Sequence, residues 1–162
     1  MELLLGLGGN TGDPPRAFRE ALRSLAGRHS VAAVSYLYRT DPQGPPQARY
    51  FNLVARLEVS APLRAFFGLC VELEAAAGRD RRLATRWGPR PLDLDLLMAP
   101  GLVLRGCDLE LPHPRLHCRA FALVPAAELA SDWVHPWLGR TLGELAGEAD
   151  ARGVERLGRF EL

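Results

Sequence analysis

The sequence predicts a ferredoxin-like α/β (α+β) sandwich with a βαββαβ core. Two observations indicate it. Apolar stripes at helical spacing alternate with short runs rich in β-branched and aromatic residues, and glycine and proline separate these segments. The length of 162 residues fits one domain spanning residues 1–162. A domain of this size buries roughly 70% of its unfolded surface, so it needs no disulfide or metal ion to fold.

The first strand and the first helix have clear boundary signals. Residues 2–8 form a short apolar run that ends in glycines, which is typical of a buried strand. Asp13 and Pro14 predict a helix start, with Asp as the N-cap and Pro in the first turn. Apolar residues recur at helical spacing from Phe18 onward, and we expect the helix to end at Gly27.

Two further strands follow, separated by a proline-rich connection. Residues 31–39 and 50–59 are rich in β-branched and aromatic side chains, as strands are. The connection at residues 40–49 contains three prolines, one glycine and two glutamines. Because it is too long for a tight hairpin, we expect an ordered functional loop there.

A second helix and a fourth strand complete the core. Ser60 and Pro62 predict the start of a helix whose apolar stripe continues to Ala77, and Gly78 ends it. A loop then leads to a strand at residues 92–98. Beyond the core we expect a C-terminal hairpin at residues 102–111, short helices near 121–129 and 142–149, and a last strand at 154–157.

The composition excludes several classes of protein. The formal net charge is +1, which argues against a general nucleic-acid binder. All 20 basic residues are arginine, so a Walker-type phosphate lysine and a Schiff-base lysine are both excluded. No apolar run approaches the roughly 20 residues that a membrane-spanning helix needs, and the start lacks the basic region of a secretory signal. The three cysteines are widely spaced, which indicates reduced thiols in a cytoplasmic protein.

Two carboxylates share one face of the strand predicted at residues 92–98. Successive side chains of a strand point to opposite faces, so Asp93 and Asp95 lie on one face and the neighbouring leucines on the other. At about 3.3 Å per residue the two carboxylates are about 7 Å apart along the strand. Oxygen ligands at this spacing suit hard divalent cations such as Mg²⁺. We therefore expect a metal-assisted phosphoryl-transfer site.

The loop before this strand is rich in arginine. Guanidinium groups suit the phosphates that divalent cations neutralise. A basic loop can also be a solvated surface, and the aspartates could simply pair with its arginines. Trp87 in the same loop could cover a ligand and exclude water when the loop closes. The arginines are Arg79, Arg81, Arg82, Arg86 and Arg90.

Two other side chains each allow a structural and a functional interpretation. Glu74, at the edge of the second helix's apolar face, is either a salt-bridge partner of a loop arginine or a site residue. His113 lies between Pro112 and Pro114, whose constrained backbone would position it for a ligand, whereas a single histidine is more often structural. The remaining histidines form no metal-ligand spacing.

The glycines after the first strand do not complete a dinucleotide fingerprint. The third glycine of G-x-G-x-x-G would fall at Thr11, and the order of elements lacks a parallel βαβ start. A tight turn, with close backbone approach at Gly8 and Gly9, is the favoured interpretation.

Several segments together resemble the 6-hydroxymethyl-7,8-dihydropterin pyrophosphokinase family of folate biosynthesis. The most specific is the run R-W-G-P-R-x-x-D-x-D at residues 86–95. The matching segments cover most of the chain to about residue 130. The others, in family order, are Gly8-Gly9-Asn10, Tyr38-Arg39-Thr40, Tyr50-Phe51-Asn52, Gly78-Arg79, Pro112-His113-Pro114 and Arg119-Ala120-Phe121.

The resemblance implies an activity and a nucleotide site. The family transfers diphosphate from its co-substrate ATP to the pterin hydroxymethyl group and releases AMP. Asp93 and Asp95 would bind two Mg²⁺ ions, and together with Arg81 and Arg90 they would form the catalytic set. The residues that the resemblance places at ATP are Glu74, Arg81, Arg82, Trp87, Arg90, His113 and Arg119, with either Arg81 or Arg82 in the catalytic-loop position.

The resemblance also implies a pterin site. Tyr50 and Phe121 would sandwich the flat ring, because stacking suits a planar ligand. Asn52 would read the pyrimidinone edge, since a carboxamide offers both a donor and an acceptor. Both partners are then small molecules, without nucleic acid or membrane, and we expect a monomer. The remaining pterin-pocket residues would be Thr40, Asp41, Gln43 and Trp87.

Two other functions compete with this one. A two-metal phosphodiesterase or nuclease could use the same aspartates, but it would need further metal ligands and a water-activating base, and no third carboxylate lies nearby in the sequence. A ferredoxin-like RNA-binding module could contact phosphates through the arginine loop. It would need exposed sheet aromatics and a broader positive face.

Overall fold

The computed structural model describes residues 1–42, 44, 46–79 and 88–162. Its central strands are β1 (Glu2–Gly9), β2 (Ser30–Val34), β3 (Leu37–Thr40), β4 (Tyr50–Glu58), β5 (Asp93–Met98) and β10 (Val154–Gly158). The main helices are α1 (Pro14–Ala26), α2 (Leu63–Ala76), α3 (Ala120–Ala130) and α4 (Leu142–Glu148). The shorter elements are β6 (Leu104–Arg105), β7 (Glu110–Leu111), the 3₁₀ turn η1 (Leu116–Cys118), β8 (Val134–His135) and β9 (Arg140–Thr141).

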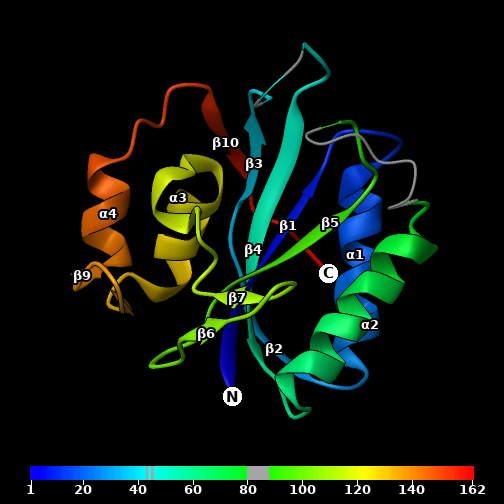
Figure 1. Ribbon diagram of the computed structural model, residues 1–162. Helices are drawn as coiled ribbons and strands as arrows, with labels where there is room; N and C mark the ends of the chain where they lie inside the picture. Colours follow the sequence, from blue (N-terminus) through cyan, green and yellow to red (C-terminus); the bar gives the residue numbers. More distant parts are fainter. Residues whose placement is uncertain (43, 45, 80–87) are drawn as a thin grey trace.

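The six central strands form one antiparallel sheet with helices on both faces. The order across the sheet is β10, β3, β4, β1, β5, and β2 pairs with β4 on the side of β3. Helices α1 and α2 cover one face of the sheet, and α3 and α4 lie on the other (Figure 1). The order and connections of the four core strands match the predicted ferredoxin-like arrangement, and α3 and α4 add a further layer.

The first helix begins and ends where the sequence predicts. The Asp13 carboxylate accepts a hydrogen bond of 3.1 Å from the backbone N–H of Arg16, which satisfies a free donor of the first turn. Pro14 occupies the first turn, and the Gly27 N–H donates back to the Arg23 carbonyl at 3.2 Å. The second helix also agrees, because Gly78 follows it with a φ of +94°, a conformation that favours glycine.

The strand predicted at residues 31–39 is interrupted in its middle. Ser35 lies between β2 and β3, and its hydroxyl accepts the backbone N–H of Val54 at 3.0 Å in place of a strand carbonyl. The neighbouring Tyr36 N–H donates to the Glu128 side chain of α3 at 2.9 Å. These side-chain bonds replace two ladder positions, so the chain bends there while both halves still pair with β4.

Two apolar clusters hold the layers together. The larger one packs Phe18 of α1 and Phe66 of α2, both fully buried, against leucines of β1, β4 and β5. The smaller one packs α3 and α4 against Leu4, Val54 and Leu97 on the opposite sheet face. No helix of the described residues is long and apolar enough to cross a membrane.

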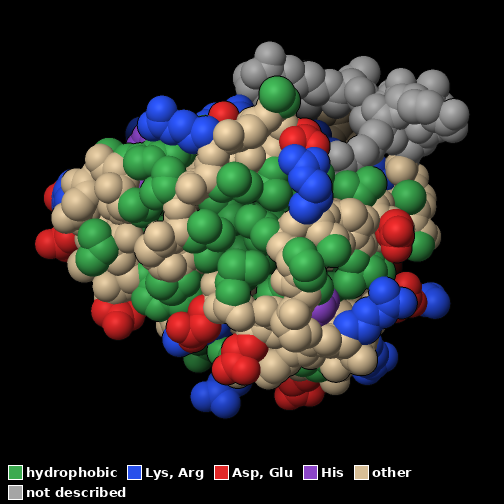
Figure 2. Space-filling model, turned by 60° about the horizontal axis from the view of Figure 1, so that its bottom comes forward, with side chains coloured by type: hydrophobic (Ala, Val, Ile, Leu, Met, Phe, Trp, Pro, Cys, Tyr) green, Lys and Arg blue, Asp and Glu red, His purple; other side chains and the backbone are tan. Residues whose placement is uncertain are grey.

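The surface turned forward in Figure 2 combines an apolar centre with charges of both signs at its margin. Arginine and acidic side chains alternate around that margin, in keeping with the formal net charge of +1. This face therefore lacks the broad positive field that RNA binding would need.

His135 in β8 is a buried polar residue outside the predicted site. It has no exposed surface, and among the described residues neither ring nitrogen has a hydrogen-bond partner. The rings of His117 and Trp137 pack edge-on against it at 5.8 Å and 5.7 Å. Burial, followed by the charge of His117, lowers the pKa of His135 below its ordinary value.

Replacing His135 by Leu should make the protein less sensitive to mild acid. A histidine whose folded pKa is lowered stabilises the native state above its unfolded pKa of about 6.5, and that stability is lost as the pH falls. Denaturant unfolding measures the free energy of unfolding of both proteins. Between pH 7 and pH 5 this free energy should fall less in the variant than in the wild type. A difference that does not change with pH would contradict this interpretation.

Candidate active site

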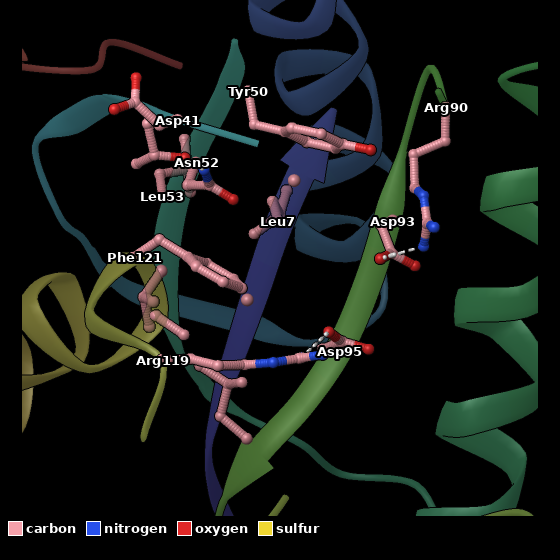
Figure 3. A pocket seen from close by; sticks show the side chains of 16 residues that line it. Leu7, Asp41, Tyr50, Asn52, Leu53, Arg90, Asp93, Asp95, Arg119 and Phe121 are labelled. Atoms are coloured by element: carbon pink, nitrogen blue, oxygen red, sulfur yellow. Dashed lines mark hydrogen bonds and ion pairs between the residues drawn. The ribbon is translucent and has the colours of Figure 1, made fainter. Parts of the chain in front are cut away.

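A pocket opens on the sheet face that carries α3, at the ends of β1 and β4 (Figure 3). Its floor is formed by Gly6, Leu7 and Gly8 of β1, and its walls come from the loop after β3, from β4, from β5 and from the start of α3. Most of the described residues expected at the site line it, namely Thr40, Asp41, Tyr50, Asn52, Arg90, Asp93, Asp95, Arg119 and Phe121. Gln43, Arg81, Arg82 and Trp87 lie outside the described residues.

Asp93 and Asp95 project from β5 into this pocket, on the same face of the strand (Figure 3). In the pairing of β5 with β1, Asp93 lies opposite Gly8 and Asp95 opposite Gly6. Because these partners have no side chains, the carboxylates face open space above the sheet. Leu94 lies in the core on the other face, as the alternation predicts.

The charge of Asp93 is compensated by two arginines. Arg90 donates to Asp93 through Nη1 at 2.8 Å, and Arg79 contacts its other carboxylate oxygen. Arg79 also pairs with Glu74 at 2.7 Å, which links helix α2 to the site. Arg79 was not among the predicted site residues, although it stands in the matched segment Gly78-Arg79.

Asp95 is less well compensated. Among the described residues its nearest cation is Nη1 of Arg119 at 3.7 Å. Burial, followed by the negative charge of Asp93, raises the pKa of Asp95 to about 7, although Arg119 acts in the opposite direction. Asp95 thus lacks a close counter-ion among the described residues, and a bound cation would supply one.

The donor set fits a magnesium ion that keeps ligands from water or substrate. Carboxylate oxygens are hard ligands, and Mg²⁺ usually takes only one or two of them together with substrate phosphates. Among the described residues no group of three or more His, Cys, Asp or Glu side chains could hold a metal. The pair Asp93 and Asp95 suits this open kind of site better than a closed structural one.

Glu74 is almost fully buried, and its structural role is visible. One carboxylate oxygen accepts the N–H of Leu94 at 2.8 Å and also pairs with Arg79. Of the two interpretations of Glu74, the salt bridge is therefore present. It fixes the strand that carries both aspartates, whereas a contact with ATP stays a prediction.

His113 borders the site next to Arg119. Its Nδ1 accepts the Arg115 N–H at 3.1 Å, which favours the tautomer with the proton on Nε2, whereas the Arg119 guanidinium, with Nη1 at 3.5 Å from Nε2, favours the other. Burial, Arg119 and Arg115 lower the pKa of His113 to about 4. The ring is therefore neutral near pH 7, and its Nε2 tautomer would offer an N–H to an oxygen ligand.

The other half of the pocket is aromatic and amide-lined. Tyr50 from β4 and Phe121 from α3 both project into it (Figure 3). Asn52 is buried beneath them and donates through Nδ2 to the Thr40 hydroxyl at 2.7 Å. That bond fixes the orientation of the amide, whose oxygen and second N–H would suit the polar edge of a flat ligand.

Asn10 connects the two halves of the site, a role that sequence reasoning missed. It exchanges hydrogen bonds with the backbone of Arg90, both at 2.9 Å. Its Nδ2 donates to the Ala48 carbonyl and to the Gln47 side chain, both at 3.0 Å. The only signal for this role was the place of Asn10 directly after the glycines.

Gly9 fits tightly against the segment that Asn10 holds. A Cβ at Gly9 would collide with the backbone carbonyl of Pro91. Gly9→Ala should therefore lower the free energy of unfolding by about 1–3 kcal/mol, the usual cost of overpacking. The matched control is Gly68→Ala in α2, where an added Cβ meets nothing within 4 Å.

The control variant should stabilise the helix by about 0.5–1 kcal/mol. Denaturant unfolding of the two variants measures both values. Equal effects in both variants would contradict the close approach of Gly9 to Pro91.

Comparison with known proteins identifies the family. The model of the 7,8-dihydro-6-hydroxymethylpterin-pyrophosphokinase family matches residues 4–131. The 2-amino-4-hydroxy-6-hydroxymethyldihydropteridine pyrophosphokinase of Pseudomonas aeruginosa is 40% identical over 158 residues, covering 94% of each chain. The Synechocystis protein of the same name is 37% identical over 153 residues, covering 93% of this chain and 77% of its own.

The fold comparison agrees. A Plasmodium falciparum HPPK-DHPS structure matches 91% of this chain with a TM-score of 0.68 at 12% identity. An HPPK-DHPS complex with substrates matches 90% with a TM-score of 0.64. The chain spans less than half the length of those solved chains, 45% and 43%, so they support the fold alone. The chain belongs to the 7,8-dihydro-6-hydroxymethylpterin-pyrophosphokinase family.

Proposed function

We propose that this enzyme transfers diphosphate from ATP to the hydroxymethyl group of 6-hydroxymethyl-7,8-dihydropterin, giving AMP and the pterin diphosphate in folate biosynthesis. One observation carries the proposal: a single pocket places paired carboxylates and arginines beside an aromatic, amide-lined half. Family membership supports the same reaction.

Asp93 and Asp95 would hold two Mg²⁺ ions. When bound, these ions supply neutralisation of the triphosphate charge and orientation of the reacting groups. The chain supplies the rest. Glu74 holds β5 in place through the Leu94 N–H, and Arg79 and Arg90 fix the Asp93 carboxylate at the pocket mouth.

Arginines would supply the charged phosphate contacts, because the sequence contains no lysine. Arg90 and Arg119 lie on opposite sides of the carboxylate pair (Figure 3). The guanidinium group of each is planar and can donate two parallel hydrogen bonds to phosphate oxygens. The His113 N–H would add a neutral donor, and Arg81 or Arg82 with Trp87 would complete the nucleotide site.

The aromatic half would bind the pterin. Tyr50 and Phe121 would stack on its faces, and Asn52, already oriented by Thr40, would read its pyrimidinone edge. Asp41, together with Gln43 and Trp87, would close the remaining side. This arrangement would direct the hydroxymethyl group toward Asp93 and Asp95, where the phosphate site begins.

We also propose that residues 1–162 act as one domain, as a monomer in the cytoplasm. Both apolar clusters share the same sheet, which supports a single folding unit. The three cysteines, all in described parts of the chain, form no disulfide, which suits a reducing compartment.

A turnover assay tests the proposal. Purified protein should consume ATP only when Mg²⁺ and the pterin are both present, with one ATP lost per pterin, and EDTA should stop the reaction. ATP that stays intact under these conditions would overturn the proposal. Cleavage of nucleic acid would then support the phosphodiesterase or nuclease alternative. RNA binding without turnover would support the RNA-binding module.

A further inference from the structure

The C-terminal strand β10 lies beside the strand that leads into the pocket. It pairs antiparallel with β3, with Val154 opposite Thr40 and Glu155 opposite Arg39 (Figure 1). Thr40 is the last residue of β3 and lines the pocket. Because the family model matches only residues 4–131, β10 lies outside the matched region.

The turn before β10 is fitted to Asp41. The Asp41 N–H donates to the Gly153 carbonyl at 3.0 Å. Gly153 has a φ of +76°, and a Cβ there would collide with the Asp41 carboxylate. Only glycine therefore suits both the backbone conformation and the close approach of a pocket-lining side chain.

Arg49 closes the loop that begins at Asp41. Its Nε pairs with the Asp41 carboxylate at 2.9 Å, so the first and last residues of the 41–49 loop are joined. Its Nη1 pairs with Glu155 at 2.9 Å, and its Nη2 donates to the carbonyls of Arg39 at 3.3 Å and Gly153 at 3.2 Å. One guanidinium thus connects both ends of the loop to the last strand.

Glu155 is the charged anchor of this arrangement. It receives hydrogen bonds from Arg39 and Arg49, which keep its pKa below the ordinary value. These side chains are a third to two-thirds exposed, so their ion pairs add little to global stability. Their effect is on the pocket nearby. Arg49 directly precedes Tyr50, so holding Arg49 also positions Tyr50, whose hydroxyl donates to the Gly88 carbonyl at 2.9 Å.

We propose that Glu155 is a positioning residue for the pterin site: through Arg49 it holds the 41–49 loop so that Asp41 and Tyr50 face the pocket. The proposal rests on the proposed function for the identity of the ligand. Glu155 is not among the described residues that line the pocket, so it acts on the pterin through the loop.

Steady-state kinetics of Glu155→Ala test the proposal. Loosening the loop should raise the KM for the pterin about tenfold, since small misplacements of binding groups are costly. The KM for ATP and the thermal midpoint should stay near the wild-type values. Glu155→Gln keeps an acceptor oxygen for the arginines and should give an intermediate KM.

Glu148→Ala is the matched control. Glu148, the last residue of α4, is an exposed carboxylate that pairs with Arg140 rather than with Arg39 or Arg49. Its KM for the pterin should equal that of the wild type. An unchanged pterin KM in Glu155→Ala, or a parallel loss of ATP binding and thermal stability, would overturn the proposal.

A second measurement needs no pterin. Trypsin cuts after arginine, and the bound Arg49 should be protected in the native protein. Mass spectrometry should show a several-fold faster cut after Arg49 in Glu155→Ala, but not in Glu148→Ala. An unchanged rate of cleavage after Arg49 in Glu155→Ala would overturn the anchoring role of Glu155. A lack of pterin turnover by the wild-type protein would instead overturn the proposed function.

Discussion

Asp95→Asn should lower kcat by about 10³-fold or more, because a metal site supplies several kcal/mol of transition-state stabilisation and each 1.36 kcal/mol is a factor of ten. Asparagine keeps the size of the side chain but loses the charge that a divalent cation needs. Kinetics with saturating ATP, Mg²⁺ and pterin measure the loss. Asp132→Asn, an exposed aspartate outside the pocket, is the control and should keep full activity.

The same variant should not be less stable in metal-free buffer. Burial and the neighbouring charge of Asp93 both oppose the ionised form of Asp95. A neutral amide removes the cost of holding a charge at this position. The free energy of unfolding of the variant should therefore equal or exceed that of the wild type. A variant that is both inactive and unfolded would contradict the account of Asp95 as a functional rather than structural carboxylate.

Arg119→Ala should lower kcat/KM by about 10²-fold or more, the usual cost of removing a donor aimed at developing charge. Arg119 pairs with Asp95 at 3.7 Å and lies over the Phe121 ring at 5.5 Å from its centre, so it borders both halves of the pocket. Lysine would keep the charge but lose the planar fork, and Arg119→Lys should recover only part of the activity.

Arg105→Ala is the control for this experiment, because Arg105 packs on Trp137, away from the pocket. It should leave kcat and both KM values unchanged. Activity of Arg119→Ala within threefold of the wild type would contradict a phosphate-binding role for Arg119.

Local patterns predicted the frame of the molecule well. Asp13 and Gly27 bound α1 as expected, and the alternation in β5 placed Asp93 and Asp95 on one face above the core leucines. Such features follow from periodicity and capping, which involve only neighbouring residues. The break at Ser35 was missed because its cause is a bond to Val54, a residue on another strand.

The site was predicted less completely, for the same physical reason. The resemblance supplied Tyr50, Asn52 and Phe121, but the contacts that hold them come from residues distant in the sequence. Asn10 reaches Arg90 across 80 positions, and Glu155 reaches Arg49 across 106. Polar contacts of this kind leave no periodic signal, so only the folded chain reveals them.

Product identity tests the central claim most directly. Wild-type protein is incubated with ATP, Mg²⁺ and 6-hydroxymethyl-7,8-dihydropterin, and the products are separated by chromatography. The account predicts AMP and a diphosphorylated pterin in equal amounts, because the transferred group is the terminal diphosphate. ADP with a monophosphorylated pterin would contradict it, since attack would then fall on the terminal phosphorus.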